Sequence, residues 1–133
     1  MNAKQILTER FGGDTLIGLA TCVDNIPSVR TVNAWYRDGY FYVITYALSN
    51  KMKQIAANPH VGVCGEWFTG HGVAENLGHV LKEEHKEIMR MLRAAFASWY
   101  NNGHVNEQDE NTCLLRIRLT DGAVYKDGQR YDF

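Results

Sequence analysis

The residues best suited to chemistry are a set of basic and hydroxyl side chains that match a phosphate group. Arg30 lies in a stretch whose neighbours Val29, Val32 and Ala34 are suited to burial in a strand. A guanidinium inside such a strand needs an anionic partner, and its planar fork fits a phosphate. The alternative is a half-exposed strand from which Arg30 points into water.

A second basic group lies at the start of a short predicted helix, Ser49 to Asn58. Lys51 and Lys53 occupy its first turns without an acidic residue, although the helix dipole disfavours cations there by about 0.3–1 kcal/mol each. A phosphate at this helix start would reverse the local field, held by free N–H groups, the Ser49 hydroxyl and Lys51. The alternative is that both lysines extend into solvent on their long stems.

Thr45 joins this group if two strands pair as a simple hairpin. Asp38-Gly39 is the strongest hairpin signal in the chain, and it separates the Arg30 strand from a strand that ends near Thr45. A regular hairpin would bring Arg30 and Thr45 close to the helix start. The sequence therefore predicts one phosphate site.

The elements that must position these residues are mostly strands joined by turns. The patterns predict strands at Thr15–Val23, Val29–Tyr36, Tyr40–Tyr46, Val61–Phe68, from there past Thr69-Gly70 to about Val80, Leu115–Leu119 and Ala123–Lys126. Turns are expected at Asp24-Asn25, Asp38-Gly39, Thr69-Gly70, Asp121-Gly122 and Asp127-Gly128. Three helices are predicted, Asn2–Arg10, Ser49–Asn58 and Lys82–Tyr100, the last with an apolar stripe of Ile88, Leu92, Ala95, Phe96 and Trp99.

Strands connected by hairpins do not form a parallel doubly wound sheet. They indicate a mainly β fold with inserted helices, either an antiparallel barrel or an antiparallel sheet with helical caps. The chain has 133 residues and no low-complexity linker. We therefore expect residues 1–133 to form a single domain.

The composition restricts which kinds of partner and which cellular compartment we expect for this protein. The net charge of −1 argues against a nucleic-acid surface, and no run approaches the ~20 apolar residues that span a bilayer. No apolar signal-peptide core is present, and three widely spaced cysteines are typical of reduced thiols, so we expect a cytoplasmic protein. We expect no metal site, because no zinc-like ligand spacing accompanies the scattered His60, His71, His79, His85 and His104.

Three short segments of the chain together match a pattern known from one protein family. They are Pro27-Ser28-Val29-Arg30-Thr31-Val32, Tyr42-Val43-Ile44-Thr45 and Ser49-Asn50-Lys51-Met52-Lys53-Gln54-Ile55-Ala56-Ala57-Asn58-Pro59. This pattern resembles the pyridoxamine 5′-phosphate oxidase family, and more narrowly its FMN-binding split-barrel group with general stress protein 26-like members. The resemblance covers residues 5–80 well and the closing strands near 113–126 less specifically.

The resemblance implies a split β-barrel, antiparallel and Greek-key-like, that forms a homodimer with two FMN molecules at the subunit interface. It implies that Arg30 and Lys51 contact the FMN phosphate, with Ser49 or Asn50 beside them. The remaining implied contacts are the backbone of Arg30, Thr31, Val32 and Asn33, the Ile44-Thr45 pair, and Trp67 or Phe68 from the same chain or its partner.

Two departures from the family pattern restrict the activity. Asn50 stands where a second basic residue is often found, and the chain ends at Phe133 without the arginine-bearing segment by which true pyridoxamine phosphate oxidases hold their substrate. Vitamin oxidation is therefore not expected.

Three functions stay open at this stage. The first is an FMN-dependent oxidoreductase acting on an unidentified small molecule, and the second is a flavin-binding redox or stress module without turnover. The third is the same barrel binding haem or a deazaflavin, since fold does not fix function. No side chain is an obvious general acid or base, and Tyr46, His71 and His79 are the candidates.

Overall fold

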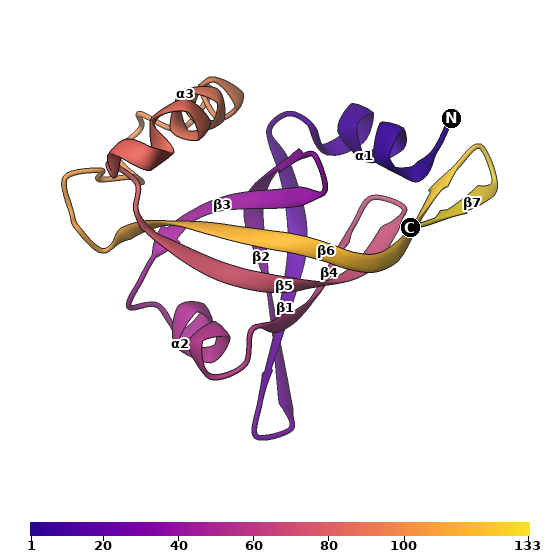
Figure 1. Cartoon of the computed structure of the whole chain (residues 1–133), viewed down its shortest axis with the longest axis horizontal. Coiled ribbons are helices and arrows are strands. Elements are labelled where there is room, and N and C mark those ends of the chain that lie inside the picture. The colour runs from indigo at the N-terminus through magenta and orange to yellow at the C-terminus, as the bar shows by residue number, and fades with distance from the viewer.

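The computed structural model describes residues 1–133, in which six of seven strands close into an antiparallel barrel (Figure 1). The strands are β1 (Thr15–Val23), β2 (Ile26–Arg37), β3 (Tyr40–Tyr46), β4 (His60–Gly65), β5 (Phe68–His79), β6 (Thr112–Lys126) and β7 (Gln129–Asp132). Their order is β3-β2-β1-β4-β5-β6-β7, and a further pairing between β3 and β6 closes the barrel. Because β4 returns to lie beside β1 after a three-strand meander, the topology is a Greek key. The predicted mainly β split-barrel fold is confirmed.

Two of the five expected turns are wrong: one lies earlier in the chain and the other is part of a strand. The turn predicted at Thr69-Gly70 is formed by Glu66 and Trp67, because Gly65 pairs with Phe68 and leaves only two residues between β4 and β5. Asp121-Gly122 is not a turn but part of β6, beside an irregularity in its pairing with β5. Glycine is required there for close approach of the strands, since a Cβ on Gly122 would lie 2.4 Å from the carbonyl oxygen of Thr69.

The helices are α1 (Ala3–Phe11), α2 (Asn50–Ala57) and α3 (Lys86–Ala95), with a short 3₁₀ helix at Glu83–His85. The single helix predicted over Lys82–Tyr100 is therefore wrong at both ends. Beyond Ala95 the chain continues through tight turns, with bonds such as Trp99 N–H to the Phe96 carbonyl. These turns keep Phe96 and Tyr100 buried, so the apolar pattern continues after the α-helix has ended.

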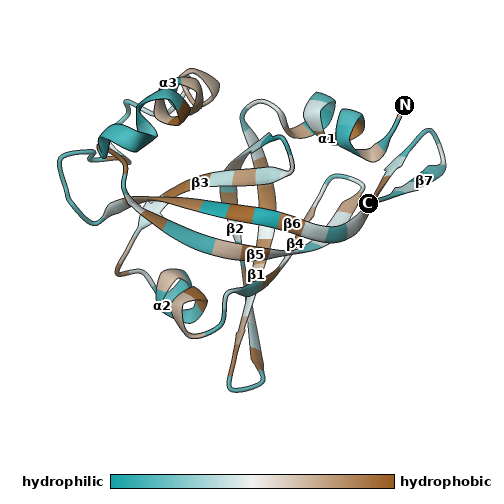
Figure 2. Ribbon diagram, viewed as in Figure 1, coloured by the Kyte–Doolittle hydropathy of each residue, from teal (hydrophilic) through white to brown (hydrophobic).

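Two hydrophobic clusters hold these elements together. The larger fills the barrel and receives Ile6 and Leu7 from α1 and Met52 and Ile55 from α2, so these two helices pack against the barrel core. The smaller lies outside the barrel, where α3 packs on strand residues such as Trp35. Figure 2 shows the alternation of apolar and polar residues along β6 that places one face of this strand inward. None of the helices is both long and apolar enough to cross a membrane.

Candidate functional site

The barrel is split between β2 and β3. These strands pair only near their hairpin, from Arg37 opposite Tyr40 to Trp35 opposite Tyr42. Farther on, β2 pairs with β1 alone, while the rest of β3 pairs with β6. The simple hairpin expected from the sequence is thus wrong beyond its first three pairs, because pairing with β6 along its whole length draws β3 away. The facing edges retain backbone N–H and C=O groups without strand partners, which a ligand can use.

Arg30 lies at this split with its guanidinium on the inner face of the barrel wall. It is directly opposite Leu19, which is fully buried, and opposite residues of an antiparallel pair share a face. Arg30 Nη1 donates to Thr21 Oγ1 at 2.9 Å and to the Leu19 carbonyl at 3.3 Å, while Nη2 donates to Gln54 Oε1 at 2.7 Å. All of these partners are neutral.

Lys51 of α2 brings a second positive charge to the same place. Its ammonium donates to Thr45 Oγ1 at 2.5 Å, from a half-buried position. Burial lowers the pKa of Lys51, and the nearby charge of Arg30 lowers it further. Burial also lowers the pKa of Arg30. The two cations therefore destabilise one another electrostatically, as expected of a site that awaits an anion.

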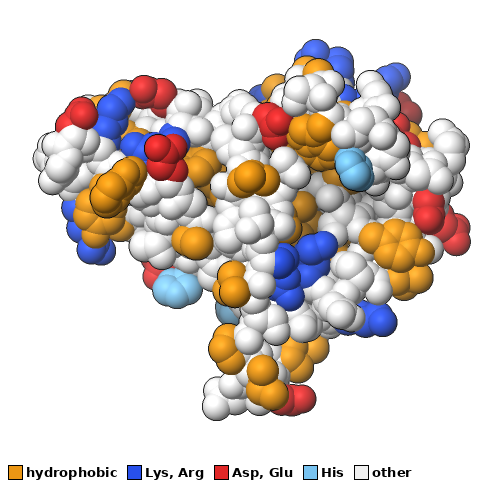
Figure 3. Space-filling view, turned by 180° about the vertical axis from the view of Figure 1, so that it is seen from behind, with side chains coloured by type: hydrophobic (Ala, Val, Ile, Leu, Met, Phe, Trp, Pro, Cys, Tyr) orange, Lys and Arg blue, Asp and Glu red, His pale blue; other side chains and the backbone are white.

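Neither cation forms an ion pair. All nine ion pairs of the molecule involve other residues. Figure 3 shows a group of Lys and Arg side chains above the protruding β1–β2 hairpin, with no Asp or Glu side chain adjoining it. The uncompensated charge makes this part of the molecule a candidate phosphate site.

Ser49 occupies the N-cap position of α2, as the sequence predicts, but its side chain makes no capping hydrogen bond. Its Oγ is buried and has no hydrogen-bond partner at all. A buried hydroxyl without a partner is costly, and a phosphate oxygen would satisfy it. Asn50, the first residue of α2, and Lys53 are both exposed.

Further predicted cofactor residues lie on β2 and β3. Thr31 is exposed, Val32 packs against the barrel core, Asn33 donates to Asp14 Oδ1 at 3.4 Å, and Ile44 packs into the outer cluster beneath α3. The side chain of Ile44 thus points away from Arg30, which leaves its backbone as the part nearest the split. The stretch from Thr31 to Asn33 lies on β2 beside Arg30.

The structure does not bring Trp67 or Phe68 to Arg30 within one chain. Trp67 is 71% exposed in the β4–β5 turn beside Tyr125, and Phe68 is buried in the barrel core. The β4–β5 turn lies near α1 and the C-terminus, far from α2 (Figure 1). A contact of Trp67 with a flavin held by Arg30 would therefore need a second subunit.

Thr21 and Gln54 are the contacts of Arg30 in the candidate site that sequence reasoning missed. Thr21 is buried in β1, and its hydroxyl donates to Gln54 Oε1 at 2.6 Å. Gln54 falls three residues after Lys51, so both point to the same side of α2. A polar residue at helical spacing from Lys51 was a usable signal, whereas the contact of α2 with β1 depends on the tertiary fold.

None of the candidate acids and bases is a contact of Arg30 or Lys51. His71 Nδ1 lies 3.0 Å from Asp121 Oδ1 on the surface, and the ring of His79 contacts the backbone oxygen of Glu107 at 2.6 Å. Tyr46 is exposed at the end of β3.

A groove lies on the outer face of the barrel, on the other side of β2 from the Arg30 guanidinium. It has a volume of about 450 Å³ and reaches from Arg30 and Thr31 across Gly18 to Cys64. Gly18 keeps the floor of the groove open for the Cys64 thiol, since a Cβ there would lie 2.8 Å from its Sγ.

Comparison with known proteins agrees with this architecture. The family model described as pyridoxamine 5′-phosphate oxidase matches residues 6–126. The chain belongs to the pyridoxamine 5′-phosphate oxidase family. The proposed grouping of the Arg30 strand with the Lys51 helix lies within the matched residues, and no curated protein matches the sequence.

Solved structures share the fold of this family member at low sequence identity. General Stress Protein 26 from Bacillus anthracis str. Sterne is 21% identical over the whole of both chains, with a TM-score of 0.73. An FAD-binding protein from Mesorhizobium loti is 18% identical over 92% of each chain, with a TM-score of 0.71. The heme storage protein HutZ from Vibrio cholerae is 14% identical over 90% of this chain and 92% of its own, with a TM-score of 0.68. At these identities the likeness establishes the fold.

Proposed function

We propose that this chain binds FMN at the split between β2 and β3 and acts as an FMN-dependent oxidoreductase on a small molecule. The observation that carries the proposal is the pair of cations, Arg30 and Lys51, which lie close together with only neutral partners. A phosphate would supply the missing negative charge and accept charge-assisted hydrogen bonds from both. Family membership and the name of the Mesorhizobium loti protein add support for a flavin.

The chain's residues have distinct roles in this proposal. Arg30 and Lys51 hold the phosphate, with the unpartnered Ser49 hydroxyl and the start of α2 beside them, while Thr45 and Gln54 orient the two cations. The free backbone edges of β2 and β3 lie along the sugar chain and the ring. When bound, the flavin supplies electron and hydride transfer, while the protein positions the ring.

We also propose that the active form is a homodimer with the flavin at the interface. Leu16 and Val29 are 60% and 72% exposed on the outer face of β1 and β2, and both border the groove. Large apolar side chains exposed along one groove favour an interaction site, and a two-fold dimer would bury this groove against its copy. Light scattering that finds only a monomer in the presence of FMN would contradict this part of the proposal.

The decisive experiment titrates the protein with FMN and with riboflavin, which lacks the phosphate. Arg30→Ala and Lys51→Met should each weaken the binding of FMN by roughly 10- to 100-fold, the equivalent of one or two charge-assisted hydrogen bonds. The affinity for riboflavin should stay almost unchanged. Lys53→Met is the matched control, because Lys53 lies in the same helix, is exposed and has no partner. Equal losses for both ligands would show that the phosphate lies elsewhere.

Spectra of the purified protein separate the remaining functions. A flavin spectrum that is released on denaturation supports the proposal, whereas a Soret band would assign the barrel to haem. Bleaching of the flavin by NADH or NADPH without oxygen, followed by reoxidation by an added acceptor, distinguishes an oxidoreductase from a flavin-binding module without turnover.

A further inference from the structure

The turn between β4 and β5 displays a tryptophan in an unfavourable conformation. Trp67 has a φ of 50°, in the left-handed region that bulky residues rarely adopt. Its side chain is also 71% exposed, so the indole gains little from burial. Strain and exposure of this kind concentrate at functional sites, and neither is needed to connect two paired strands, because Asn-Gly or Asp-Gly serves that purpose.

Arg10 of α1 holds this turn in place. Its Nη1 donates to the carbonyl oxygens of Glu66 at 3.0 Å and Trp67 at 3.4 Å, and its Nη2 donates to the carbonyl of Tyr125 at 2.9 Å. Arg10 forms no ion pair with any carboxylate. The guanidinium is thus fixed in position and keeps an uncompensated positive charge.

The Trp67 cleft is the space between the β4–β5 turn and the β6–β7 hairpin, at the end of the barrel away from α2 (Figure 1). It has a volume of about 530 Å³ and is lined by Arg10, Trp67, Tyr125, Lys126, Asp127 and Gly128. The rings of Trp67 and Tyr125 meet edge to face with centroids 6.5 Å apart, which leaves a face of the indole open.

Arg10 is a cation of the cleft that no carboxylate pairs with. The lining of the cleft contains two cations and one carboxylate, that of Asp127. Lys126 is already balanced by Glu9, whose carboxylate lies 3.1 Å from the ammonium. The charges that remain in the lining are Arg10 and the carboxylate of Asp127, which do not pair with each other. An anionic group against Arg10 would gain the attraction that no side chain provides.

We propose that the Trp67 cleft binds a small planar aromatic compound that carries an anionic group, such as a nucleoside monophosphate. The ring stacks on the exposed face of Trp67, as bases do on aromatic side chains, and the anionic group lies against Arg10. This site is separate from the phosphate site at Arg30, and it stands whether or not the chain binds FMN.

AMP and adenosine are the probes, because they share a ring and differ in charge. Trp67 fluorescence reports binding, since Trp35 is only 6% exposed and Trp99 is half-buried. AMP should quench the fluorescence saturably and bind at least about ten times more tightly than adenosine, the factor expected for one charge-assisted contact. Arg10→Gln should reduce the affinity for AMP to that for adenosine. Lys4 is an exposed cation of the same helix, and Lys4→Gln should leave both affinities unchanged.

Two further variants keep the result unambiguous. Trp67→Ala, followed by equilibrium dialysis, should weaken AMP and adenosine together by at least about tenfold, and it removes no polar contact of Arg10, whose bonds go to backbone oxygens. Arg30→Ala should leave AMP binding unchanged. Equal affinity for AMP and adenosine would overturn the proposal, and so would a loss of AMP binding in Arg30→Ala. A loss of FMN affinity in Trp67→Ala would also overturn it, because Trp67 would then belong to the flavin site of a partner subunit.

Discussion

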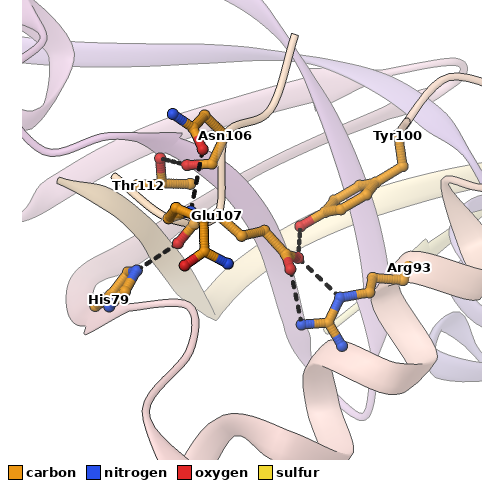
Figure 4. A network of polar contacts seen from close by, with 7 residues as sticks. His79, Arg93, Tyr100, Asn106, Glu107 and Thr112 are labelled. Carbon is orange, nitrogen blue, oxygen red and sulfur yellow. Dashed lines mark hydrogen bonds and ion pairs between the residues drawn. The ribbon is translucent and has the colours of Figure 1, made fainter. Parts of the chain in front are cut away.

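The cations of this molecule meet two contrasting environments. Around Glu107, Arg93 Nε donates to Oε2 at 2.8 Å, the Tyr100 hydroxyl donates to the same oxygen at 2.5 Å, and the His79 ring contacts the backbone oxygen (Figure 4). Around Arg30, by contrast, the partners are a threonine hydroxyl, a glutamine carbonyl and a backbone carbonyl.

We propose that this difference separates a structural cluster from a binding one. The Glu107 cluster joins α3, β5 and the segment 101–111, and its charges neutralise each other. Burial and the neighbouring carboxylate raise the pKa of Tyr100, which keeps its hydroxyl neutral and able to donate. In the Arg30 cluster the charges of Arg30 and Lys51 add, and burial, followed by the charge of Arg30, lowers the pKa of Lys51. A folded chain tolerates this arrangement when a ligand provides the counter-charge.

The strongest test of this comparison places a carboxylate beside Arg30. Gln54→Glu keeps the size of the side chain and the oxygen that accepts from Arg30 Nη2 and Thr21. The new charge should form an ion pair with Arg30 and repel a phosphate, so FMN affinity should fall by roughly 100-fold or more, the effect of losing one charged contact and gaining one repulsion. Titration of FMN by fluorescence measures the change.

The same variant should become more stable without a ligand, because Arg30 then resembles Arg93. Urea unfolding of the ligand-free protein measures this gain. Gln129→Glu on the exposed strand β7 is the control for an added carboxylate. Undiminished FMN affinity in Gln54→Glu would mean that the phosphate does not approach Arg30.

Much of this site follows from local sequence signals. The Asp38-Gly39 turn, the break before α2 and the placement of Arg30 within a strand all follow from residue types and spacing. The splitting of β2 from β3 does not, because it results from pairing between β3 and β6, which are far apart in the sequence. The roles of Thr21 and Gln54 depend on the same tertiary packing.

The turns show a second limit of local signals. Asp121-Gly122 has the residues of a turn, yet it lies within β6, where close approach to Thr69 requires a glycine. Glu66-Trp67 has no turn residues, yet it forms the turn, with Arg10 holding its carbonyl oxygens. In both places a contact with a distant strand or helix overrides the local preference, and the second contributes to the Trp67 cleft.

The reverse change, removal of the counter-charge from the structural cluster, should affect stability and not the ligand. Glu107→Gln leaves Arg93 without its carboxylate and weakens the bond from Tyr100. The free energy of unfolding should fall by about 1–3 kcal/mol, the cost of leaving a half-buried charged hydrogen-bonded group unpaired, while FMN affinity stays the same. Glu110→Gln, an exposed acid on the same segment, is the control in urea unfolding. A loss of FMN affinity without a loss of stability would show that the two clusters do not divide the roles in this way.

The smallest expected effect comes from the titration of Lys51. Its pKa in the folded, ligand-free chain lies below the ordinary value of 10.5, because burial and then Arg30 disfavour the charged form. At lower pH both the folded and the unfolded chain carry this proton, so the full cost of burying the charge is present. Between the lowered pKa and 10.5 the folded chain loses the proton first, and this cost disappears as the pH rises.

The stability of the wild-type chain relative to Lys51→Met should therefore increase with pH through this range. Because Lys51 is only half-buried, solvent screens the interaction and the increase should be smaller than the loss in Glu107→Gln. Urea unfolding of both proteins at a series of alkaline pH values measures the difference. Bound FMN should reduce the pH dependence, since the negative charge of its phosphate raises the pKa of Lys51. A pH dependence that is unchanged by FMN would mean that the phosphate does not lie at Lys51.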